Sequence, residues 1–195
     1  MLASEPKNQA PFTRRVVQKV KQRVKRKPAP VANPITMYDS VTVSEIPSAA
    51  AAVAGYVNGM YPTWSKLVSS FPHAHKLSIA VNAATDAECL DVEAGDASPP
   101  EAAAWVRRQI ARGVKRPVVY CSTSVAPTVL ADLAAHGITR AMIRLWTAHY
   151  TDKPHRCSSV CGNGFHDTAD ATQYTDRALG RNLDASLCSP KFFDA

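Results

Sequence analysis

The segment Cys89-Leu90-Asp91-Val92-Glu93 carries two acidic residues, one position apart, inside an apolar run. This pattern predicts a β-strand. Successive side chains of a strand alternate between faces, so Asp91 and Glu93 point one way and Leu90 and Val92 the other. The two acidic positions are then ~6.6 Å apart, from a rise of ~3.3 Å per residue. In a site shielded from water, two carboxyl groups at this spacing cannot both ionise freely, so the pKa of one of them rises. The protonated group can then act as a general acid beside its ionised neighbour. The alternative is a strand end with two solvated acids.

Short apolar runs alternate with helix-like segments on both sides of this strand. Ser98 and Glu101 form a capping box that starts one helix, Pro127–His136 is a second helix ended by Gly137, and Pro47–Ala54 is a shorter third ended by Gly55. We expect about eight strands, at 35–39, 56–57, 76–81, 88–93, 117–121, 141–148, 172–174 and 182–187.

Alternating strands and helices indicate an α/β protein with a parallel sheet. Eight strands within residues 35–195 are dense for a parallel barrel, whose usual size is ~250 residues, so some connecting helices must be very short or missing. The sequence therefore predicts a compact (β/α)8-type, TIM-like barrel with short or missing helices.

Acidic residues recur at one end of the predicted strands. Asp39, Asp91 with Glu93, and Asp184 each lie at or near the carboxyl end of a strand. In a parallel barrel these ends meet at one rim, where active sites are assembled. Three strands that deliver carboxylates to one rim favour a catalytic site over solvated strand ends.

The positive charge of the chain is confined to its N-terminus. Residues 1–30 hold nine basic residues and one acidic residue, a net charge of +8, while the whole chain has +7, so the remainder is close to neutral. We interpret residues 1–34 as a basic arm with a Pro-rich linker and residues 35–195 as the barrel. The arm either contacts an anionic polymer or surface or is a solvated tail. A near-neutral body argues against a globular nucleic-acid-binding surface.

The cysteines show no zinc-binding pattern. A zinc site usually has two closely spaced ligand pairs, and only Cys157 with Cys161 is visible, so we expect no metal and no cofactor. A Cys157–Cys161 or Cys161–Cys188 disulfide is the alternative if the protein works outside cells. No apolar run is long enough to span a membrane, and no secretory signal is evident.

Six segments in order resemble the family 25 glycoside hydrolases, the Chalaropsis-type lysozymes that cut bacterial peptidoglycan. Asp91-Val92-Glu93 resembles the family's central Asp-x-Glu. The other five segments are Tyr38-Asp39-Ser40, Pro117–Ser122, Leu145–Tyr150, Thr172–Thr175 and Asn182–Asp184. Divergent glycoside hydrolase-like barrels of actinobacteria and their phages fit the same residues.

The resemblance implies an N-acetylmuramidase-like glycosidase with Glu93 as the catalytic acid. Asp91 beside it would be the source of a raised pKa. Asp39 and Asp184 would orient the sugar's N-acetyl group or stabilise developing positive charge. The implied sugar-binding residues are Tyr38, Tyr120, Trp146, Tyr150, Gln173 and Tyr174.

Departures from the family pattern keep a second hypothesis open. The third predicted strand ends in Ala80-Val81-Asn82-Ala83 rather than in aromatic residues and a histidine, and Thr172 stands where tryptophan is common. The barrel could therefore bind cell-wall glycan, or serve as a phage or structural component, without catalysis. In a third hypothesis the arm is the main functional element. We expect a monomer, and a lysin of this kind would reach the wall by release from the cytoplasm or by non-classical export.

Overall fold

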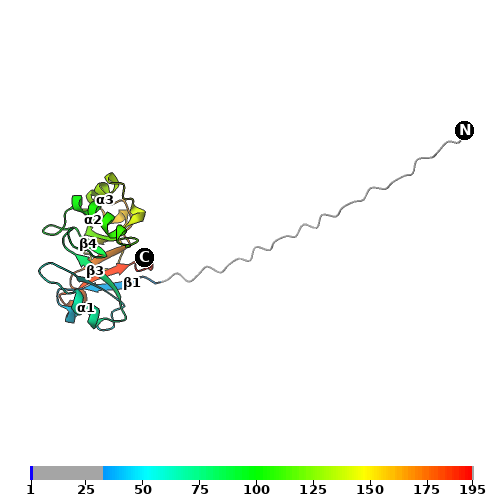
Figure 1. The fold of residues 1–195 in the computed structure, drawn as a ribbon. Helices are drawn as coiled ribbons and strands as arrows, with labels where there is room; N and C mark the ends of the chain where they lie inside the picture. The colour runs from blue at the N-terminus through cyan, green and yellow to red at the C-terminus, as the bar shows by residue number, and fades with distance from the viewer. Residues whose placement is uncertain (2–32, 195) are drawn as a thin grey trace. The chain divides into compact units, whose positions relative to one another are not determined.

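The computed structural model describes Met1 and residues 33–194 (Figure 1). The predicted basic arm lies almost entirely outside the described residues. The barrel begins at Ile35, the first residue of the first strand.

Eight strands form a closed barrel in sequence order, as expected. They are β1 (Ile35–Asp39), β2 (Ala52–Tyr56), β3 (His75–Ala80), β4 (Cys89–Asp91), β5 (Val118–Ser122), β6 (Arg144–Ala148), β7 (Ala171–Thr175) and β8 (Asp184–Cys188). Strands β1 to β7 run parallel, whereas β8 is antiparallel to both β7 and β1. The expectation of a wholly parallel sheet is therefore wrong at β8. Residues 176–183 are too few for the crossover of a dozen or more residues that a parallel strand requires.

Three α-helices accompany the strands in the described chain: α1 (Trp64–Ser70), α2 (Pro99–Ala111) and α3 (Ala126–Ala135). The capping box of Ser98 and Glu101 is present at the start of α2, as predicted. Short 3-10 turns occupy Val43–Glu45, Arg140–Met142, Ser159–Cys161 and Ala178–Gly180. The structure is thus a strand-rich α/β barrel with few helices.

The helix predicted at Pro47–Ala54 is wrong, because Ala52–Tyr56 forms β2 between β1 and β3. The small residues of this segment are buried in the sheet, so tertiary packing overrides the helical preference of alanine. Helix α1, which packs against β2, was not predicted.

The core has three parts that follow the alternation of side chains along the strands. One lies inside the barrel and includes Met37, Ile79 and Trp146. A second lies between the sheet and the pair α2 and α3, and a third lies under α1. Figure 1 shows α2 and α3 together on one side of the barrel and α1 on the other. No helix within residues 33–194 is long and apolar enough to cross a membrane.

Candidate functional site

The reversed direction of β8 brings Asp184 to the predicted rim. Asp184 is the first residue of β8, not near its carboxyl end as we expected. Because β8 is antiparallel, its beginning lies beside the ends of the parallel strands, and Asp184 is the register partner of Asp39, the last residue of β1. The acidic residues therefore lie at one mouth of the barrel, as predicted, but Asp184 reaches it from the start of an antiparallel strand and not from the end of a parallel one.

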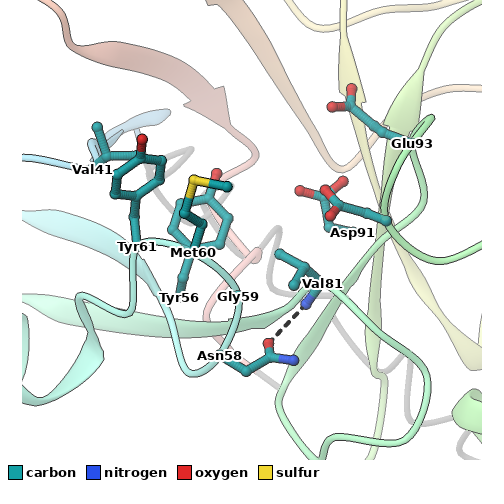
Figure 2. Close-up of a pocket in the computed structure, with 10 residues that line it drawn as sticks. Val41, Tyr56, Asn58, Gly59, Met60, Tyr61, Val81, Asp91 and Glu93 are labelled. Carbon is teal, nitrogen blue, oxygen red and sulfur yellow. Dashed lines mark hydrogen bonds between the residues drawn. The ribbon is translucent and has the colours of Figure 1, made fainter.

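Asp91 and Glu93 line one cavity of about 260 Å³ at this mouth. They point the same way, as the alternation predicted, while Leu90 and Val92 pack into the core on the outside of the sheet. Asp91 is 4% exposed, whereas Glu93, just beyond the end of β4, is open to solvent. Figure 2 shows the two carboxylates on one side of the cavity, facing Met60 and Tyr61 on the other.

The strongest shift of this acidic pair falls on Asp91. Burial, and then the charges of Glu93 and Asp96, raise the pKa of Asp91 to about 8. Asp91 therefore holds a proton at neutral pH, and its Oδ1 is a buried polar atom without a partner in the described chain.

Partial burial also raises the pKa of Glu93; the nearby Tyr120 hydroxyl opposes this rise, and the charge of Asp96 adds to it. We expected Asp91 to be the source of the shift. The charge that raises the pKa of Glu93 is instead that of Asp96. The solvent around Glu93 keeps it in exchange with bulk protons, which a general acid needs between turnovers.

Asp39 and Asp184 form a second acidic pair. Asp39 is buried, and burial, its hydrogen bond with Asp184 and the charges of Asp184 and Asp91 hold its pKa well above the usual range. Burial raises the pKa of Asp184 to about 6, although hydrogen bonds with Asp39 and Gln173 oppose the rise. Two carboxyl groups in hydrogen-bond contact share a proton, as in other acid dyads.

Two buried polar residues, Tyr120 and Gln173, lie beside the two acidic pairs. The hydroxyl of Tyr120 donates to Oε1 of Gln173 at 2.6 Å. Gln173 also lies close enough to Asp184, and Tyr120 close enough to Glu93, to lower the pKa of those carboxyl groups. Tyr120 and Gln173 thus lie between the two acidic pairs.

The other predicted sugar-binding residues lie in three different places. Tyr150 is exposed, and it lies close enough to Tyr120 and the acidic residues at the mouth for them to affect its pKa. Trp146 is only 2% exposed, donates its indole N–H to Ser186 Oγ at 3.0 Å and packs against the Tyr120 ring, with centroids 4.6 Å apart. Trp146 is therefore part of the barrel core and not a stacking wall. Tyr38 and Tyr174 line a separate hollow with Asp152 and Arg177.

The far wall of the cavity was missed by the sequence analysis. Most of it comes from the end of β2 and the segment that follows, with one residue after β1 and one after β3; its lining residues are Val41, Tyr56, Asn58, Gly59, Met60, Tyr61 and Val81. Met60 and Tyr61 are 83% and 57% exposed. The signal that could have found this wall is the run Asn58-Gly59-Met60-Tyr61-Pro62, which puts large apolar side chains in a turn directly after a strand.

Asn58 and Gly59 fix the position of this wall. Asn58 Oδ1 accepts a hydrogen bond from the backbone N–H of Val81 at 2.9 Å (Figure 2), and its Nδ2 donates to Thr85 Oγ1 at 3.0 Å. Gly59 has φ +88°, and a Cβ there would lie 2.9 Å from Val81 Cγ2. Glycine is therefore required for the loop to approach β3.

Comparison with known proteins gives a fold but no family. No protein-family model and no curated protein matches the chain. A solved structure, the 1.07 Å crystal structure of an uncharacterized B. stearothermophilus protein, is similar with a TM-score of 0.60 at 14% sequence identity. The match covers 82% of this chain and 98% of that one. At this identity the similarity shows a shared fold alone.

Proposed function

We propose that this protein is a glycoside hydrolase with a shortened (β/α)8-type barrel, that it cleaves glycosidic bonds of bacterial peptidoglycan, and that Glu93 is the general acid. The observation that carries the proposal is that Glu93, the exposed member of four clustered carboxyl groups, lines an open cavity opposite aromatic and apolar side chains. A sugar ring needs both kinds of surface, since its C–H face stacks on aromatic rings and its hydroxyl groups need polar partners.

In this proposal Glu93 gives its proton to the leaving glycosidic oxygen as the bond from that oxygen to the anomeric carbon breaks. Water then adds to the anomeric carbon, and Glu93 regains a proton from solvent. Asp91, protonated at neutral pH, donates a hydrogen bond to the sugar rather than a negative charge. The Asp39–Asp184 pair orients the acetamido group or stabilises positive charge at the anomeric carbon.

The second candidate is a barrel that binds cell-wall glycan without cutting it. The burial of Asp39 and Asp91 favours this alternative, because it leaves only Glu93 and Asp96 as accessible acids among the described residues that line the cavity. Accessible carboxylates suffice for binding, whereas hydrolysis also requires a nucleophile, an activated water or an assisting acetamido group.

Release of reducing ends from purified peptidoglycan tests the proposal, with the native chain compared with Glu93→Gln. The matched control is Glu88→Gln, since Glu88 precedes β4 at the opposite end of the same strand. We expect Glu93→Gln to lower the rate by ~10²–10⁴-fold, the usual contribution of a general acid, and Glu88→Gln to leave it unchanged. Cosedimentation of the native chain with peptidoglycan without new reducing ends supports the binding barrel. Equal hydrolysis by native protein and Glu93→Gln contradicts the assignment of Glu93.

A further inference from the structure

Four metal-ligating side chains converge in the segment between β6 and β7, outside the carboxylate cluster. They are His149, His155, Cys157 and Cys161, and their candidate ligand atoms all lie within 4.8 Å of one another. We propose that these residues form a zinc-binding site of the Cys2His2 type. From the sequence we expected no metal, because only Cys157 with Cys161 was recognised as a closely spaced ligand pair; His149 and His155, with five residues between them, supply the second pair.

The separations between the ligand atoms are close to those of a tetrahedral site. His155 Nε2 lies 3.0 Å from His149 Nδ1 and 3.6 Å from Cys157 Sγ. Around zinc, bonds of ~2.0–2.1 Å to nitrogen and ~2.3 Å to sulfur place neighbouring ligand atoms ~3.3–3.8 Å apart. Small shifts of the side chains therefore suffice to admit the ion.

His155 has the tautomer that metal binding requires, with the proton on Nδ1 and a free lone pair on Nε2. Its Nδ1 lies 2.8 Å from the backbone oxygen of Lys153, which can only accept, so Nδ1 carries the proton. Nε2 then directs a lone pair toward His149 and Cys157. A metal-bound histidine commonly donates its other N–H to a carbonyl in this way, which orients the ring and raises its basicity.

The backbone around the ligands is already held in place. The N–H of Cys157 donates to Thr172 Oγ1 at 2.8 Å, and the N–H of His149 donates to the oxygen of Gln173 at 2.9 Å, so both are tied to β7. Cys161 ends a 3-10 turn and is followed by Gly162 with φ +73°, which turns the chain away from the cluster. A site on a fixed backbone loses less conformational entropy when the ion binds.

The ligand set indicates zinc in a structural role. Two thiolates and two imidazoles suit Zn²⁺, and their charge balances that of the ion. Four protein ligands leave no open position, which is typical of structural sites. Residues 149–170 contain little regular secondary structure, and a bound ion would crosslink them beside Tyr150 at the barrel mouth. The five cysteines, all within the described chain, are free, and Cys188 lies inside the barrel away from Cys161.

Metal analysis of the full chain tests the proposal. The protein is purified under reducing conditions with zinc in the medium, and we expect about one tightly held zinc per chain. Cys161→Ser and His155→Ala should each lose most of this zinc, while His73→Ala and Cys121→Ala, which alter the same residue types elsewhere, should keep it. Circular dichroism of each variant reports whether the fold is retained. Should Cys161→Ser unfold, His155→Ala decides the outcome.

Cobalt substitution supplies a readout that depends on the ligands. Co²⁺ in a tetrahedral site with thiolates gives intense visible bands and an ultraviolet thiolate charge-transfer band. We expect both bands in the native chain, and we expect the charge-transfer band to weaken in Cys161→Ser. Equal zinc content in the native chain and the ligand variants would overturn the proposal, as would cobalt spectra without a charge-transfer band. A Cys157–Cys161 disulfide that persists after purification under reducing conditions would overturn it as well.

Discussion

Asp39 and Asp184 are register partners on the antiparallel strands β1 and β8, and the proximity of the Asp184 carboxyl group helps to raise the pKa of Asp39. This pairing depends on the reversed direction of β8. A parallel β8 would place its first residue at the opposite end of the barrel, and Asp39 would lose the neighbour that shares its proton.

Replacement of Asp184 should lower the pKa of Asp39. Asp184→Asn removes the charge and the carboxyl hydrogen bond that help to raise it, whereas burial, the largest cause, remains. We therefore expect the pKa of Asp39 to fall and yet stay above its usual range, as measured by carbon-detected NMR titration of the side-chain carboxyl. Asp194→Asn, at an exposed position near the C-terminus, serves as the control. An unchanged Asp39 titration in Asp184→Asn would refute the coupling.

The buried proton of Asp91 should make the fold more stable at low pH. The folded-state pKa of Asp91 is about 8 and its ordinary value is 3.8, so the folded state binds the proton more tightly than the unfolded state. By linkage, the contribution of Asp91 is fully favourable below about pH 4 and is lost as the pH rises toward 8.

Asp91→Asn should remove this dependence. Urea unfolding at several pH values should show little difference between native chain and variant near pH 4, and a variant more stable by a few kcal/mol near pH 8.5, since each pKa unit corresponds to ~1.4 kcal/mol. A native chain that gains stability relative to Asp91→Asn between pH 4 and 8 would contradict the assignment.

Tyr61 should contribute to glycan binding and little to folding. Its side chain is half exposed on the cavity wall opposite Asp91. Tyr61→Ala should weaken binding to peptidoglycan several-fold, since a stacking contact contributes ~0.5–1.5 kcal/mol, and the unfolding midpoint should shift little. Cosedimentation with peptidoglycan and urea unfolding measure the two effects. Binding equal to that of the native chain would exclude this wall from the glycan site.

Trp146, in contrast, should contribute to folding stability and little to glycan binding. Trp146→Ala opens space in the barrel interior and removes the indole donor of Ser186, so we expect a loss of ~3–5 kcal/mol in the free energy of unfolding. Trp146→Phe keeps most of the volume and should lose less. If Trp146→Phe retains stability but loses glycan binding, the tryptophan contacts substrate after all.

Local pattern predicted much of this barrel. The alternation in Cys89–Glu93 placed both acids on one face, and the capping box at Ser98 located α2. The prediction of a helix at Pro47–Ala54 was wrong. The alanine content of this segment indicates a helix, but the position of Ala52–Tyr56 between β1 and β3 imposes extended pairing. The conformation of that segment is decided by strands that are its neighbours in space but are distant in the sequence.

The sequence by itself determined the strand periodicity, the spacing of the acidic residues and the basic character of the N-terminus, since each depends on residues close together in the chain. The tertiary structure alone decided the direction of β8, the burial that raises the pKa of Asp91, and the convergence of His149 and His155 with Cys157 and Cys161. These features arise from contacts between separate strands or across an irregular loop. Such contacts depend on how the barrel closes, and closure is a property of the whole fold.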